Sequence, residues 1–225
     1  MVGGDLSNLA RRRDAWSPVA PAPGESIVAF VNRFNEEWVA AARRISPALL
    51  ADMVEQLGEP IAAYFGSLDP HALGGAVTWA GPDPMPVWLD VAREYTERWL
   101  HQQHVRDAVG RPGQREPGFL APVLATFVRA LPHAYRAADA PEGTTIGVRI
   151  DGDSGGAWSV VRADGRWRLY EGTTDNAIAT VRMSDDTAWR LLTRGLSSDA
   201  ANRAVALEGD RALAARVLDA VAIIA

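Results

Sequence analysis

The residues best suited to chemistry are a carboxylate and an imidazole set one helical turn apart. Glu97 and His101 stand four positions apart in the segment from Arg93 to Ala108, so on a helix their side chains are neighbours. Zinc accepts both ligand types, and a catalytic zinc takes three protein ligands and keeps one position open. His104 is a possible third ligand, but it lies two turns from Glu97. The alternative is a solvated helix face carrying an acid–imidazole pair.

A long helix, about Val87 to Val109, must position this pair. At about 100° per residue, its acidic and imidazole side chains fall in one sector, and its apolar ones gather opposite. The first set comprises Asp90, Glu94, Glu97, His101 and His104, and the second comprises Trp88, Val91, Tyr95 and Trp99. The polar sector is therefore expected to face water or a polar cavity.

The chain before residue 115 reads as helical. Apolar spacing predicts a helix over Ile27 to Arg44, and Ser46-Pro47 opens a second helix with an N-cap and a first-position proline. Asp5 to Arg13 reads as the tail of another helix. Glycine and proline from Gly110 to Gly118 then break the pattern. We expect two domains, 1–115 and 116–225, the first an incomplete bundle of about three helices plus a fragment.

The second domain mixes helical and strand periods, which indicates an α+β fold with an antiparallel sheet. Asp164-Gly165 is typical of a hairpin turn between two of its strands. A helix is expected first, then four strands, then two helices: Phe119–Ala138; Thr145–Ile150, Ala157–Val161, Trp167–Tyr170 and Ala177–Met183; and Asp186–Arg194 and Asp210–Ile224.

Composition narrows the function classes. The formal net charge of -5 argues against a nucleic-acid partner, and the absence of cysteine excludes thiolate ligands and a protein thiol nucleophile. No apolar stretch of about 18 residues predicts a membrane span, and no signal pattern opens the chain, so a cytoplasmic location is expected. All basic residues other than histidine are arginine, which suggests a GC-rich bacterial genome.

Several segments together resemble one family. The string Arg93–Ala108 is similar to the signature helix of the mycothiol-dependent maleylpyruvate isomerase family, part of the DinB-like metal-binding bundles, an actinobacterial group. Gly3–Asp14 resembles the second helix of that family, and Val77–Pro82 resembles the loop before its signature helix. Trp158, Trp167-Arg168-Leu169 and Gly209-Asp210 resemble its C-terminal sterol-carrier-like domain. The likeness covers nearly the whole chain.

The resemblance implies a metal site of Glu97, His101 and a further histidine that would lie just before Val2. Either a mis-assigned start codon removed that histidine, which we favour, or this is a short relative with an impaired metal site. The resemblance also assigns Arg194 to the active site, where its fork would bind a substrate carboxylate. The alternative for Arg194 is a helix end stabilised by the helix dipole.

The implied function is a zinc- and mycothiol-dependent isomerase or thiol transferase, which would act on a small electrophilic acid with a low-molecular-weight thiol. A second hypothesis is a non-catalytic small-molecule or lipid binding protein, and a third is a metal-free remnant of the family. In the second, the apolar end would line a tunnel, whereas plain core packing is the alternative for Val217, Leu218, Val221, Ile223 and Ile224. The substrate and the oligomeric state are left open.

Overall fold

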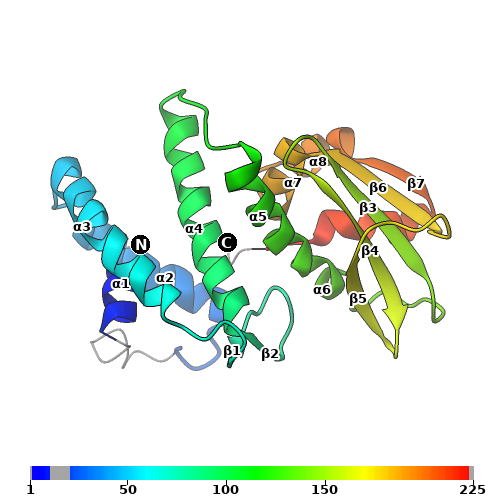
Figure 1. Ribbon diagram of the computed structural model, residues 1–225, viewed down its shortest axis with the longest axis horizontal. Coiled ribbons are helices and arrows are strands. Elements are labelled where there is room, and N and C mark those ends of the chain that lie inside the picture. The colour runs from blue at the N-terminus through cyan, green and yellow to red at the C-terminus, as the bar shows by residue number, and fades with distance from the viewer. Residues whose placement is uncertain (1, 11–20, 223–225) are drawn as a thin grey trace. The chain divides into compact units, whose positions relative to one another are not determined.

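The structure is a computed structural model that describes residues 2–10 and 21–222. It forms two compact units that divide between Pro70 and His71 (Figure 1). The division differs from the expected boundary near 115. The boundary differs because the long helix that was expected to belong to the first domain, Val87–Ala108, packs against the helix that follows it in the chain.

The first unit consists of helices α1 (Val2–Leu9), α2 (Ile27–Ala42) and α3 (Pro47–Gly66) in its described residues. Ser26 and Ser46 cap α2 and α3, each side chain accepting a hydrogen bond from the backbone N–H three residues on. α1 packs against α3. The helical nature of this region is confirmed, while the expected extension of α1 to Arg13 lies outside the described residues.

The second unit opens with a small hairpin that the sequence did not predict. Strands β1 (Leu73–Ala76) and β2 (Pro84–Pro86) pair antiparallel, and β2 leads directly into helix α4 (Val87–Ala108). The long helix is therefore confirmed to within a residue. The residues just before it, which the sequence assigned to no element, contribute strand β2.

The next expected helix, Phe119–Ala138, is broken into α5 (Pro117–Phe127), a 3-10 turn (Val128–Ala130) and α6 (Leu131–Ala134). Pro132 explains the break, because proline donates no backbone hydrogen bond and its ring crowds the carbonyl four residues earlier. The chain keeps its direction. Arg129, Pro132, His133 and Arg136 therefore still follow one another at helical spacing.

A five-stranded sheet follows, in the order β5-β4-β3-β6-β7. Its strands are β3 (Thr145–Asp151), β4 (Gly156–Ala163), β5 (Arg166–Glu171), β6 (Ala179–Ser184) and β7 (Ala206–Gly209). The α+β class is confirmed. The expectation of an antiparallel sheet needs one correction: β3 and β6 pair parallel, because the connection after β5 carries the chain across the sheet before β6 begins.

The predicted hairpin turn between β4 and β5 is confirmed in detail. Asp164 and Gly165 both have positive φ, 52° and 71°, the combination that a type I′ turn requires. β5 is the first strand in the sheet order, and among the described strands it pairs with β4 alone. The free side of β5 is therefore an edge of the sheet.

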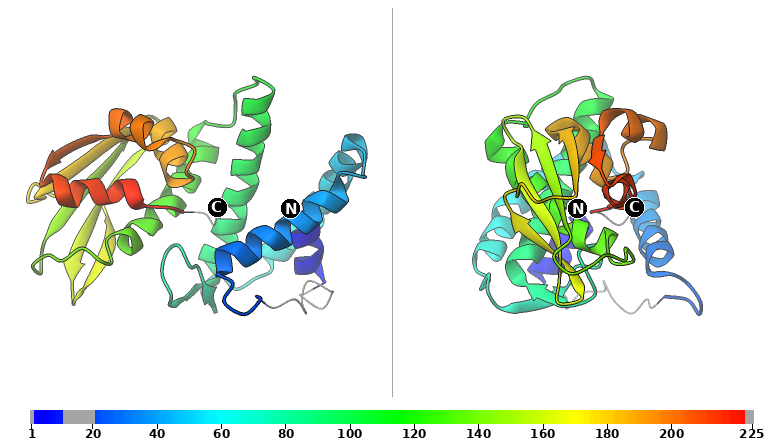
Figure 2. Two further views of the ribbon diagram at one scale, coloured as in Figure 1. Left: turned by 180° about the vertical axis from the view of Figure 1, so that it is seen from behind. Right: turned by 90° about the vertical axis from the view of Figure 1, so that its right-hand side faces the viewer.

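The chain continues through α7 (Asp185–Leu192), α8 (Ser198–Ala204), α9 (Arg211–Ala214) and a 3-10 turn (Ala215–Asp219). The helix expected over Asp210–Ile224 is thus shorter, and Ile223 and Ile224 lie outside the described residues. Figures 1 and 2 show α5, α6, α7 and α9 on one face of the sheet. Between helices and sheet lies the core: Leu120, Val123, Leu124, Phe127, Val128, Leu131, Tyr135, Ile146, Val148, Val160, Val181, Trp189 and Val217.

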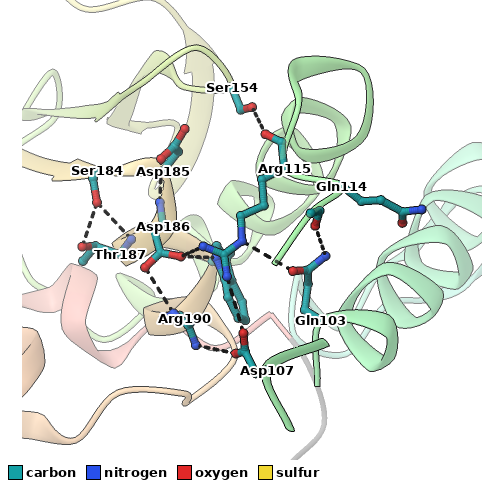
Figure 3. A network of polar contacts seen from close by, with 12 residues as sticks. Gln103, Asp107, Gln114, Arg115, Ser154, Ser184, Asp185, Asp186, Thr187 and Arg190 are labelled. Atoms are coloured by element: carbon teal, nitrogen blue, oxygen red, sulfur yellow. Dashed lines mark hydrogen bonds and ion pairs between the residues drawn. The ribbon is translucent and has the colours of Figure 1, made fainter. Parts of the chain in front are cut away.

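A polar cluster joins α4 to α7, and Figure 3 shows it from close by. Two arginines, Arg115 and Arg190, each contact two aspartates, Asp107 on α4 and Asp186 on α7, at N···O distances of 2.8 to 3.5 Å. The Arg190 guanidinium also lies 4.2 Å from the centre of the Trp189 ring. Trp189 in turn meets Trp99 of α4 edge-on, at 5.4 Å between ring centres. Charges and aromatic rings thus fix α4 to the helical layer.

The cluster predicts a stability difference between two adjacent aspartates. Asp186→Asn removes the charge that both arginines contact, and the free energy of unfolding should fall by about 1 kcal/mol, the scale of a partly exposed ion-pair network. Asp185→Asn is the matched control, since it removes the same charge in the same helical turn. Urea titration followed by circular dichroism measures both. Equal losses would show that the arginine contacts contribute nothing.

Candidate functional site

The structure brings Glu97 and His101 together on α4, as the sequence predicts. The Glu97 Oε2 and His101 Nε2 atoms lie 3.5 Å apart. Burial raises the pKa of the Glu97 carboxyl, and burial followed by the charge of His104 lowers the pKa of the His101 imidazole. Both shifts favour the uncharged forms. The contact is therefore weaker than an ion pair between fully charged groups.

The described residues do not complete a three-ligand metal site around this pair. The His104 ring stands edge-on to His101 at 5.8 Å between ring centres, and no group of three histidine, aspartate or glutamate side chains in the described part of the chain could hold a metal ion. A catalytic zinc needs three protein ligands. Glu97 and His101 supply two donors, so they do not form a catalytic zinc centre by themselves.

Arg194 lies just beyond α7, at the position that ends the helix. The Gly195 N–H donates to the Arg190 carbonyl at 2.7 Å, which is the pattern of a Schellman motif. Arg194, not Gly195, occupies the left-handed position, with φ of 57°. Its side chain is exposed, and no hydrogen bond or ion pair in the described residues joins it to Glu97 or His101.

A cleft of about 770 Å³ lies elsewhere in the second unit. Three segments build it: the stretch from Ala80 to the start of α4, one face of the helical run from Arg129 to Arg136, and strand β5 with the turn before it. Its lining holds apolar and aromatic side chains, among them Met85, Trp88 and Leu169. Its charged residues are five arginines and one aspartate: Arg129, Arg136, Arg162, Arg166, Arg168 and Asp83.

Two of these arginines, Arg129 and Arg162, lie over aromatic rings, and neither has a described carboxylate oxygen within 4.0 Å. The Arg129 guanidinium lies 4.5 Å from the centre of the Trp88 ring, and burial lowers its pKa more than the charge of Glu171 raises it. The Arg162 guanidinium lies 6.0 Å from the centre of the Trp167 ring, and its Nε is buried without a hydrogen-bond partner. Partly buried cations that lack an ion pair are costly. Their convergence on a cleft makes it a candidate anion site.

Two of the other arginines are already paired. Arg166 contacts Asp83 at 3.6 Å, and Arg168 contacts Asp164 at 3.0 Å, both between exposed side chains. Such exposed pairs contribute little. They leave the cleft with a clear excess of positive charge, because Asp83 is its single lining carboxylate among the described residues. This local charge is opposite in sign to the net charge of the chain, -5.

The sequence did not identify this cleft. Its lining comes from three separate stretches, and only the alternation of Arg166, Trp167 and Arg168 in one strand could have signalled a basic surface. The sequence also offered a tunnel at the apolar C-terminal end. Val217 of that end is buried in the core and does not line the cleft. This agrees with the alternative of plain core packing.

Comparison with known proteins gives partial likenesses. No family model matches the chain, and no curated protein sequence is significantly similar to it. Solved structures similar to it include sterol carrier protein 2-like 2 of Aedes aegypti, 17% identical over 44% of this chain and 95% of that one, at a TM-score of 0.34. A UbiJ-SCP2 ubiquinone synthesis protein is 19% identical over 46% of this chain and 92% of that one, at a TM-score of 0.29. Sterol carrier protein domain 2 of Helicoverpa armigera is 16% identical over 46% of this chain and 80% of that one, also at a TM-score of 0.29. All three TM-scores are below 0.5, so these likenesses carry no argument about function.

The αL geometry of Arg194 generates a test of its role. Arg194→Gly relieves the left-handed strain and should raise the free energy of unfolding by about 1 kcal/mol. Arg194→Ala removes the same side chain but keeps the strained backbone, so it should not stabilise the protein. Thermal and urea unfolding of both variants measure the difference. Destabilisation by glycine would mean that the arginine side chain makes contacts worth more than the strain.

Proposed function

We propose that the protein binds an anionic ligand with an apolar part in the arginine-lined cleft. The observation that carries this proposal is the pair of arginines, Arg129 and Arg162, that line the cleft without an ion pair to a described carboxylate. A bound carboxylate or phosphate would supply the missing counter-charge. Charge-assisted hydrogen bonds of this kind are about twice as strong as neutral ones.

The packing of Arg129 suits it to this task. Its guanidinium is held over the Trp88 ring at 4.5 Å, and a guanidinium can present two N–H groups to two oxygens at once. Trp88 therefore orients the donor before any ligand arrives. Met85 and Leu169 beside it offer apolar surface for the rest of the ligand.

The lining favours binding over catalysis. Proton transfer needs a carboxylate, imidazole or similar group positioned at the reacting atom. Asp83, the carboxylate of the described lining, is ion-paired with Arg166. His133 is the imidazole of the lining; burial, followed by the charge of Arg136, lowers its pKa, and no hydrogen bond among the described residues orients its ring for proton transfer. We accordingly propose a binding role for this cleft and assign it no reaction.

Isothermal titration with decyl phosphate and decanoate tests the proposal. Arg129→Gln should weaken binding by about ten-fold or more, because a hydrogen bond to a charged group contributes about 1.5 to 3 kcal/mol. Arg149→Gln is the control, since Arg149 is exposed on β3 outside the cleft and loses the same charge. Equal weakening by both substitutions would reduce the effect to net charge and contradict a site at Arg129.

A metal- and mycothiol-dependent isomerase or transferase is a second candidate function, supported by the 3.5 Å contact of Glu97 and His101. It requires a third ligand beyond those that the described residues supply. Zinc content of the purified protein tests it. About one zinc per chain, lost in both Glu97→Ala and His101→Ala but kept in His71→Ala, would support the enzyme. Equal zinc content in the parent protein and the three variants would count against the enzyme.

A further inference from the structure

The backbone of β5 carries unpaired hydrogen-bonding groups along the cleft. Ala157 and Gly172 are opposite each other, with the Gly172 N–H donating to the Ala157 carbonyl at 2.8 Å. In an antiparallel pair, hydrogen-bonded positions alternate. The register of β4 and β5 then directs the backbone groups of Arg166, Arg168 and Tyr170 toward β4. Those of Trp167, Leu169 and Glu171 point away from the sheet.

No described backbone group bonds to these outward positions, since β5 is an edge strand. Exposed edges are usually blunted or covered, because they template pairing with another strand. Here the cleft runs along the edge itself. Six consecutive residues, 165–170, line it. The free N–H and C=O groups of Trp167 and Leu169 therefore border the same space as Arg129 and Arg162.

Positive charge flanks this edge on both sides. The Trp167 and Leu169 side chains point to the helical face of the sheet, where Arg162 lies opposite Trp167 in the register and Arg129 stands over Trp88. Arg166 and Arg168 point to the other face. A strand added to β5 would place alternate side chains on these two faces. Acidic side chains would meet Arg129 and Arg162 on the helical face. On the other face they would meet Arg166 and Arg168, whose exposed ion pairs with Asp83 and Asp164 contribute little.

From this arrangement we propose that the ligand is an extended acidic peptide that adds a strand to β5. The inference rests on the proposed function and names the ligand class of the same site. Backbone hydrogen bonds to the edge would supply affinity, and the arginines would select acidic side chains. A five-residue segment spans about 17 Å in extended form, comparable with the length of β5. A fatty acid or alkyl phosphate could satisfy the arginines but not the outward amides.

The test uses a fluorescein-labelled peptide of sequence Glu-Val-Glu-Val-Glu with the full-length protein, followed by fluorescence anisotropy. Binding is expected, with at least ten-fold weakening in Arg129→Gln and no comparable change in Arg149→Gln. The same peptide with every amide N-methylated keeps its charge but cannot donate to a strand edge, so it should bind more weakly than the parent. A Lys-Val-Lys-Val-Lys peptide controls for charge.

The outcomes separate the inference from the proposed function. Equal binding of the parent and the fully N-methylated peptide would overturn edge pairing. Binding of decyl phosphate that depends on Arg129, with no binding by the acidic peptide and no displacement by it, would overturn the peptide and leave the anion site standing. If neither decyl phosphate nor the acidic peptide bound more weakly to Arg129→Gln, both the anion site and the peptide inference would be overturned. Tighter binding of the parent than of the N-methylated peptide, reduced in Arg129→Gln, supports the inference.

Discussion

The second unit depends on the charge cluster that fastens α4 to α7. Arg115 and Arg190 both contact Asp107 and Asp186, and the edge-on contact of Trp99 with Trp189 lies beside them. The cluster is shared by two helices far apart in the sequence, so neither can shift without breaking several charged contacts. Because α4 follows directly from β2, fixing this helix also fixes the wall of the cleft that carries Trp88.

The cleft itself is where the fold leaves interactions incomplete. Arg115 and Arg190 find carboxylates in the cluster, whereas Arg129 and Arg162 make no ion pair with a described carboxylate, and β5 beside them has a free edge. The lowered pKa of Arg129 records the cost of burying a cation whose nearby charge does not offset its desolvation. Locally unfavourable features of this kind concentrate at functional sites, where a ligand compensates for them. Two arginines without an ion pair and a free strand edge at one place support a binding site more strongly than any one of these features alone.

The elements of this fold were largely predictable from local sequence, and the cleft was not. The periodicity of α4, the caps at Ser26 and Ser46 and the Asp164-Gly165 turn depend on neighbouring residues, so the sequence predicts them well. The parallel pairing of β6 and the division at Pro70 depend on contacts between distant segments. The same holds for Arg129 and Arg162, which sequence places 33 positions apart and tertiary structure brings to one cleft. Their lack of an ion pair is visible only once every neighbour is known.

The two candidate sites share one helix but cannot form one reaction centre. Trp88 lines the cleft from the start of α4, and Glu97 follows nine residues later. Nine residues turn a helix by about 180° beyond two full turns and advance it by about 13 Å, so the two side chains point in opposite directions. A ligand held between Arg129 and β5 is therefore out of reach of the Glu97–His101 pair. Binding in the cleft does not require a metal on α4, and a metal on α4 would have to act on a different molecule or a different part of a long one.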